Sequence, residues 1–308
     1  MDPLSDVLSL LKVRTSMSGG FDVAGAWSVG FGRYDGITFH AVLAGECWVV
    51  VEGEAPLRVR AGECFLQASG RPFHFASDLG LAPVAVETVL PADYDGSIIT
   101  YNGGGEFTGV GMYVTLADRS ADLLLHQLPP IIHIQDEEGR ATMRWCLERM
   151  RQELFDPQPG GALLSQQLAT MALVQALRLH LSTRPRDAVG WLYALADKRM
   201  RAAISAMHAA PGRRWTVASL AERAAMSRTT FAVRFKETVG LAPLDYLTRW
   251  RMMLAAERLA TGRESVSEIS LALGYESEKS FSTAFKRIMR DSPRSYGRAA
   301  HRHMPHEY

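Results

Sequence analysis

The side chains best suited to a chemical task in this sequence are the basic ones near its C-terminal end. Residues 197–308 hold 20 Lys and Arg against 11 Asp and Glu, a net charge of +9, whereas residues 1–196 hold 14 against 22, a net charge of −8. Lysine and arginine neutralise phosphate groups, so a basic segment joined to an acidic one is typical of a nucleic-acid reader attached to a module that does not bind DNA. An ordinary imbalance of solvated charges would give the same totals.

The same pattern of helix, turn and helix occurs twice in this basic segment. Apolar residues recur at helical spacing, and each second helix has a phenylalanine pair at i and i+4. The copies are Val217–Ala225, Met226-Ser227 and Arg228–Thr238 with Phe231 and Phe235, and then Val266–Leu273, Gly274-Tyr275 and Ser277–Met289 with Phe281 and Phe285. We interpret this as an internal duplication, with the phenylalanines in the core rather than stacked on bases.

A helix-turn-helix motif packs one face of its second helix and leaves the other free for the DNA major groove. Ser227 and Ser277 stand where the N-caps of the two second helices belong. Gly274 suits the left-handed conformation that ends a helix. Between the copies, Leu247–Leu259 predicts a long rigid helix, which would hold the two recognition helices roughly 34 Å apart, one turn of B-DNA.

These residues resemble the AraC/XylS family of transcription regulators, whose C-terminal domain has two helix-turn-helix units joined by a long helix. The matching residues are Trp215-Thr216-Val217, Ser219-Leu220-Ala221, Ala225-Met226-Ser227, Phe231, Arg234-Phe235, Gly240, Pro243, Tyr246-Leu247, Arg251-Met252, Ala255, Leu259, Val266, Ile269, Ala272, Gly274-Tyr275, Ser277, Phe281, Phe285-Lys286, Ser292-Pro293 and Tyr296. Asp291 departs from the family, which usually has Gly there. Because Asp adopts the left-handed conformation less readily, we expect the end of the second recognition helix to differ.

The resemblance implies a role for each outward position of the two recognition helices. Base edges would be read by Arg228, Thr229, Ala232 and Val233 in the first helix and by Glu278, Lys279, Ser282 and Thr283 in the second. Phosphates would be bound by Arg234, Lys236, Arg249, Lys286 and Arg287. Thr and Ala favour thymine methyl groups and Lys279 could donate to guanine, whereas phosphate contacts set affinity rather than sequence preference. For each charged residue, a solvated surface position is the alternative.

Short apolar segments bounded by Gly, Pro, Asp or Asn follow one another in the N-terminal half. They are rich in β-branched and aromatic residues, and each has the length of a strand. The expected strands are Ile37–Val42, Cys47–Val51, Leu57–Val59, Cys64–Gln67, Val84–Leu90 and Gly109–Leu116. They predict a small antiparallel β-barrel or sandwich, preceded by a short helix at residues 4–14.

From Glu137 the apolar period becomes helical, and it predicts one helix around residues 143–154 and another over Leu163–Leu181. The apolar surface of this pair either packs on its own barrel or forms the seam of a homodimer, and we expect the second. The fold class is therefore α+β. We predict a sensing and dimerisation domain over residues 1–185 and a DNA-binding domain over 197–299, with Ser182–Asp187 as the linker.

Residues of about 10–120 resemble a cupin, the small barrel common in the N-terminal part of this family. Segments similar to the two cupin motifs are Phe39–Glu46 with Gly53, then Gly62–Phe65 and Arg71–His74. Catalytic cupins have an HxH pair, a Glu and a third His as metal ligands. Here Thr38 stands in place of the first His, and Glu46 and His74 are each offset by one residue. His40, Glu46 and His74 remain candidates for holding an effector or a metal, with an ordinary barrel histidine as the alternative.

Other features narrow the class of protein. Three cysteines without CxxC spacing imply neither a disulfide framework nor a zinc ribbon. The N-terminus has no leader pattern and no segment has the length of a membrane span, so we expect a cytoplasmic protein that does not engage a membrane.

The sequence thus predicts a transcription regulator, an activator by resemblance, which responds to a small molecule in its barrel. The implied partners are double-stranded DNA, RNA polymerase, a small-molecule effector and a second copy of the chain. We expect no enzymatic activity and no cofactor. Two alternatives stay open: a cupin-type metalloenzyme with an appended DNA-binding domain, and an architectural DNA-binding protein without an effector.

Overall fold

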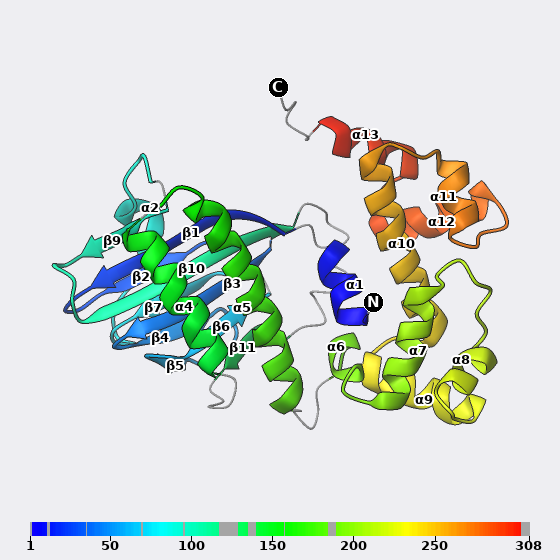
Figure 1. The fold of residues 1–308 in the computed structure, drawn as a ribbon, viewed down its shortest axis with the longest axis horizontal. Helices are drawn as coiled ribbons and strands as arrows, with labels where there is room; N and C mark the ends of the chain where they lie inside the picture. The colour runs from blue at the N-terminus through cyan, green and yellow to red at the C-terminus, as the bar shows by residue number, and fades with distance from the viewer. Residues whose placement is uncertain are drawn as a thin grey trace. The chain divides into compact units, whose positions relative to one another are not determined.

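A computed structural model gives the fold of the chain (Figure 1). The described residues are 2–10, 13–34, 36–68, 70–94, 96–116, 129–134, 140–156, 158–183 and 189–302. Strands dominate the N-terminal half and helices the C-terminal half, which confirms the predicted α+β class. The chain divides into two compact units, one made by the described residues of 13–183 and the other by those of 2–10 and 189–302. The predicted domain boundary at residue 185 lies outside the described residues.

The described strands of the first unit form two sheets. The strands are β1 (Val13–Val23), β2 (Ser28–Phe31), β3 (Ile37–Ala44), β4 (Glu46–Val51), β5 (Leu57–Arg60), β6 (Cys64–Gln67), β7 (Phe73–Ala76), β8 (Val84–Ala85), β9 (Ile98–Tyr101), β10 (Phe107–Leu116) and β11 (Ile131–Ile134). One sheet has the order β11-β6-β3-β10-β1-β9 and the other β5-β4-β7-β2-β8. Most neighbouring strands are antiparallel, but β1 pairs with β9, and β2 with β8, in parallel.

Two predicted elements in the N-terminal half of the chain are wrong in extent. Val84–Leu90 was expected to be one strand, but only Val84 and Ala85 are extended, and Val86–Val89 forms the short helix α2. The helix expected at residues 4–14 ends at Leu10 as α1 (Pro3–Leu10), and β1 begins at Val13. The sequence of β1 contains two glycines and several polar residues, so it lacks the apolar alternation that marks a strand.

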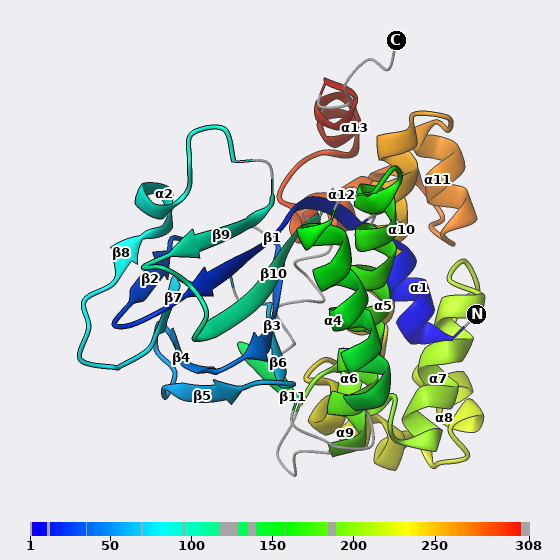
Figure 2. The same cartoon turned by 60° about the vertical axis from the view of Figure 1, so that its left-hand side comes forward.

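Two helices, α4 (Arg140–Phe155) and α5 (Gly161–Thr183), confirm the predicted helical pair. They pack on each other and against the first sheet, α5 on β11, β1 and β6 and α4 on β3 (Figure 2). This sheet is consequently covered on both faces, which explains why Ile37 and Phe39 of β3 are each only 1% exposed. The pair therefore packs on its own barrel, while the role in a dimer stays a prediction.

The short N-terminal helix α1 belongs to the C-terminal unit, although the predicted first domain includes it. It packs on α7 (Lys198–Ala209) and α10 (Pro243–Thr261). A carboxylate oxygen of Asp6 lies 3.3 Å from Nδ1 of His208, whose Nε2 lies 2.9 Å from the hydroxyl of Tyr246. Burial lowers the pKa of His208 to about 3. A neutral imidazole on α7 therefore links α1 to α10 within one unit.

The remaining helices of the C-terminal unit are arranged around α10. They are α6 (Trp191–Ala194), α8 (Val217–Arg223), α9 (Arg228–Val239), α11 (Val266–Ala272), α12 (Glu278–Met289) and α13 (Pro293–Arg302). The predicted spacer Leu247–Leu259 lies within the longer α10, which begins at Pro243, a residue suited to the first turn of a helix. Helices α9 and α12 lie near opposite ends of α10 (Figure 1).

Two constraints at Gly274 exclude a larger residue: a left-handed backbone and a close approach of another backbone segment. Its φ is +77°, and a Cβ added to it would lie 2.1 Å from the carbonyl oxygen of Gly212. We expect Gly274→Ala to lower the free energy of unfolding of the C-terminal unit by more than about 2 kcal/mol, measured by urea denaturation. Gly297→Ala is the matched control: it lies in α13 with only ordinary contacts, and it should be neutral or stabilising by up to about 1 kcal/mol. Equal effects of the two substitutions would contradict this interpretation.

Candidate DNA interface and effector cavity

The first helix-turn-helix unit consists of α8 and α9. Ser227 is the N-cap of α9, as predicted, and its hydroxyl accepts a hydrogen bond from the backbone N–H of Thr230 at 3.2 Å. The turn passes through Ala225, which is left-handed with a φ of 50°. This conformation costs a non-glycine residue about 1–2 kcal/mol, so the turn is held by the packing of the helices on either side.

The second unit consists of α11 and α12 and repeats this design with a turn one residue longer. Ser277 caps α12 by accepting a hydrogen bond from the N–H of Ser280 at 3.2 Å. Gly274 takes the left-handed position, as predicted. The two copies therefore share the N-cap serine and the left-handed turn residue, while the residue type at the left-handed position differs.

Both recognition helices bury one face completely. The side chains of the two predicted phenylalanine pairs are 0% exposed: Phe231, Phe235, Phe281 and Phe285. The prediction that they belong to the core rather than to a base-stacking surface is confirmed. Because one face of each helix is fixed in the core, the opposite face is left to solvent.

Most positions expected to contact DNA lie on these solvent-facing sides. The exposed ones are Arg228, Thr229, Val233, Arg234, Lys236, Lys279, Thr283, Lys286 and Arg287, and the half-buried ones are Ala232, Arg249, Glu278 and Ser282. Val233 is 53% exposed. An exposed valine on a recognition helix suits apolar contact with a thymine methyl group. Contact of each residue with DNA stays a prediction.

Arg234, one of the predicted phosphate ligands, has a protein partner. Its guanidinium donates to the carboxylate of Asp197 at 2.6 Å. Asp197 is also the N-cap of α7, where it accepts a hydrogen bond from the N–H of Arg199. The ion pair ties α9 to the start of α7, so Arg234 positions the recognition helix in addition to any contact with phosphate.

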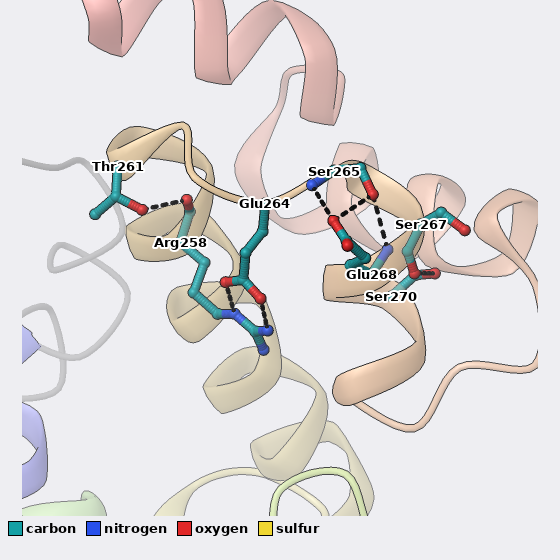
Figure 3. A network of polar contacts seen from close by, with 7 residues as sticks. All are labelled: Arg258, Thr261, Glu264, Ser265, Ser267, Glu268 and Ser270. Carbon is teal, nitrogen blue, oxygen red and sulfur yellow. Dashed lines mark hydrogen bonds and ion pairs between the residues drawn. The ribbon is translucent and has the colours of Figure 1, made fainter.

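A polar network fixes the second helix-turn-helix unit to the end of α10 (Figure 3). The guanidinium of Arg258 donates two hydrogen bonds to the carboxylate of Glu264, one of them at 2.6 Å. Immediately afterwards, Ser265 and Glu268 form a capping box at the start of α11. The bidentate pair closes the loop between α10 and α11, and the box satisfies amides of the first turn of α11.

The end of the second recognition helix differs from the expectation at Asp291. The left-handed residue after α12 is Arg290, with a φ of 62°, at the position that Gly240 occupies after α9. The Asp291 carboxylate instead accepts a hydrogen bond from the N–H of Ser292 at 2.7 Å. The strained position is therefore one residue earlier than predicted.

The barrel unit contains a cavity of about 510 Å³ lined from both sheets. Its wall is largely aromatic, and the rings include Phe31, Phe65, Phe73, Phe75, Phe107 and Tyr113. This set was not predicted from the sequence, because β2 and β7 were not expected as strands and their phenylalanines were not assigned to one face. The cavity is in the size range of sites for small molecules.

His40 is the predicted effector residue that lines the cavity. Its ring stacks on Phe65 with centroids 5.0 Å apart and meets Phe75 edge-on at 4.8 Å. Burial lowers the pKa of His40 to about 3, so the imidazole is neutral at physiological pH. Its Nε2 atom is buried and has no hydrogen-bond partner among the described residues.

Glu46 and His74 do not join His40, which corrects the predicted group of three. Cys47 and Phe73 line the cavity, so their neighbours Glu46 and His74 point to the other face of the second sheet. Glu46 lies 3.5 Å from the guanidinium of Arg60 and forms an ion pair with Arg58. Within the described part of the chain, no group of three or more His, Cys, Asp or Glu could hold a metal ion. The three cysteines are buried and form no disulfide among the described residues.

Comparison with known proteins agrees with both halves of this description. A family model described as "Cupin" matches residues 2–182, and one described as "Helix-turn-helix domain" matches residues 220–299. A "Putative AraC-like transcription regulator" of Streptomyces lividans is 40% identical over 298 residues, covering 96% of this chain and 98% of that protein. The "RCS-specific HTH-type transcriptional activator RclR" of Escherichia coli is 32% identical over 180 residues, 58% of this chain and 63% of its own.

Among solved structures, the DNA-binding domain of AdpA in complex with a target DNA is 33% identical, with a TM-score of 0.32, and covers 34% of this chain and 95% of that one. A two-sheet barrel followed by paired helix-turn-helix units defines a DNA-binding protein with a cupin domain. The chain belongs to the AraC family of transcription regulators, and its relatives are regulators rather than enzymes. None of the described helices combines the length and apolarity needed to cross a bilayer.

The buried imidazole of His40 makes the stability of the barrel depend on pH. Its pKa is about 3 in the folded chain against 6.5 as its ordinary value, so below pH 6.5 the unfolded state binds a proton that the folded state does not. Stability is therefore full above pH 6.5 and is lost as the pH falls toward 3. When the pH falls from 7 to 5, we expect the free energy of unfolding of His40→Phe to decrease by about 2 kcal/mol less than that of the original chain, as measured by urea denaturation. Parallel pH profiles of the two proteins would contradict a neutral buried His40.

Proposed function

We propose that this AraC-family regulator binds a specific DNA site with both recognition helices. The observation that carries the proposal is the paired design of α9 and α12: each has a fully buried phenylalanine face and an opposite face that exposes basic, hydroxyl and apolar side chains. Lysine and arginine supply affinity for phosphate, whereas Thr229, Val233 and Lys279 suit base edges. We expect the two helices to enter successive major grooves of one duplex.

We further propose that a small molecule in the barrel cavity controls this binding and that the regulator activates transcription with RNA polymerase. The aromatic cavity supports the first part, and the resemblance to the family supports the second. A homodimer through α4 and α5 is supported by large apolar side chains that remain exposed there, Trp145 at 58% and Leu163 at 63%.

We infer that no metal is required, since Glu46 and His74 point away from His40. We also propose that the protein is cytoplasmic, because a regulator of this kind binds chromosomal DNA.

Genomic footprinting followed by binding measurements tests the DNA proposal. The full chain should bind its recovered site at least about a thousandfold more tightly than random DNA of the same length and at the same salt concentration. An architectural protein would show nearly equal affinity for both. Such equality would overturn the proposed function.

Lys279 and Lys286 provide a matched pair of substitutions on α12. If Lys279 reads a base, Lys279→Ala should lose about 1–3 kcal/mol of binding free energy, and the loss should vanish when one base pair of the site is changed. Lys286→Ala should weaken binding to all sequences and reduce the slope of log K against log salt by about one. Gel-shift titrations at several salt concentrations measure both effects. A uniform loss for Lys279→Ala would assign this residue to phosphate instead.

A further inference from the structure

The interior of the barrel cavity carries no charge at physiological pH. Of the titratable side chains that line it, His40, Cys47 and Tyr34 are desolvated, and their shifted pKa values leave them neutral. Burial lowers the pKa of His40 to about 3, raises the pKa of Cys47 to about 12 and raises the pKa of Tyr34 well above its usual range. An ionised ligand placed among these groups would lose its hydration without gaining a counter-charge, which is costly.

The charged residues of the cavity wall are exposed. Arg33 has a side chain that is 77% exposed, and its guanidinium lies 3.7 Å from the carboxylate of Glu52. Glu87, on α2, is also exposed. Charge at these two positions is screened by water, so it does not favour an anion inside the cavity.

The cavity wall favours an aromatic occupant over a flexible aliphatic one. Phe31 and Phe73 stack at 4.7 Å with their planes 6° apart, and Phe75 lies 5.2 Å from each of them. Ring edges and faces that are already arranged for stacking and edge-on contact give an aromatic ligand additional stabilisation beyond the burial of area. A rigid ring system also loses less conformational entropy on binding than an alkyl chain.

Among the described residues that line this wall, His40 has a buried polar atom without a hydrogen-bond partner. The Nε2 atom of His40 is buried among Phe65, Phe73 and Phe75 without a hydrogen bond to any described residue. By contrast, the Tyr34 hydroxyl lies 3.3 Å from the hydroxyl of Thr38 and donates to the carbonyl of Gln67 at 3.4 Å. A ligand hydroxyl, carbonyl or ring nitrogen that meets Nε2 after a turn of the His40 ring would supply the missing hydrogen bond.

We propose that the cavity binds an uncharged aromatic molecule whose one polar group hydrogen-bonds to His40. This names the chemical class of the effector and so rests on the regulatory function proposed above. Because all residues that line the cavity lie in the barrel unit, the binding of such a molecule can be tested apart from its effect on DNA.

Isothermal titration calorimetry of the full chain with three matched compounds tests the class. We expect 2-naphthol to bind at least tenfold more tightly than 2-naphthoate, which carries a charge, and than 1-octanol, which has no ring. Equal or tighter binding of 2-naphthoate would overturn the uncharged class, and tighter binding of 1-octanol would overturn the aromatic one. Absence of 2-naphthol binding up to its solubility would also overturn the proposal.

Substitutions at two histidines locate the binding. His40→Phe keeps a ring but removes both nitrogens, so it should weaken 2-naphthol about tenfold and leave naphthalene unchanged. His40→Gln, which retains hydrogen-bonding groups, should keep more of the 2-naphthol affinity and serves if the first variant folds poorly. His74→Phe, on the opposite face of the second sheet, is the matched control and should change neither affinity. Equal losses at both histidines would place the compound outside the cavity.

Sequence-specific DNA binding is measured on the same preparations. If the specific site is still preferred while 2-naphthol fails to bind, only the ligand class is wrong. If 2-naphthol binds as expected but the DNA shows no specific site, the proposed function fails while the cavity assignment stands. If both hold, adding 2-naphthol should shift the affinity for the specific site in the original chain and not in His40→Phe.

Discussion

The burial of two phenylalanines in each recognition helix is the interaction on which the DNA-binding unit depends. Side chains at i and i+4 lie on one face of a helix, so fixing this face in the core determines which residues point outward. The surroundings then refine the placement: Asp197 holds α9 through Arg234, and Glu264 holds the end of α10 through Arg258. These polar contacts are partly exposed and each contributes little energy, so they orient helices that the apolar core has already placed.

The first sheet applies a similar constraint to the barrel. Helices α4 and α5 cover its outer face, so β3 is buried on both sides and can carry apolar residues at consecutive positions. On its inner side, the first sheet faces the phenylalanines of β2 and β7 in the second sheet, and these rings desolvate the groups beside them. Desolvation in this interior keeps His40 neutral, and it raises the pKa values of Cys47 and Tyr34, which are neutral at physiological pH in any case.

The sequence predicted the DNA-binding unit closely because its signals are local. Phe281 with Phe285, the N-cap Ser277 and the turn residue Gly274 each lie within a few residues of the partners that fix their conformation. The barrel site depends on strand pairing between distant segments, so a shift of one residue moved Glu46 and His74 to the wrong face in the prediction. Strand β1 was missed for a related reason, since pairing with β9 and β10, and not its own residue pattern, makes it a strand.

Strand β3 connects the cavity to helix α4, so a ligand in the cavity can change the packing of α4 through this strand. Thr38 and His40 line the cavity, while Ile37 and Phe39 between and beside them are buried on the side where α4 packs. Close-packed side chains do not yield independently, so a ligand that displaces the His40 ring must move the backbone of β3 or be excluded. A regulatory effect then requires that the ligand bind one of two arrangements of β3 and α4 more tightly than the other, by about 1.4 kcal/mol for each tenfold change in their ratio.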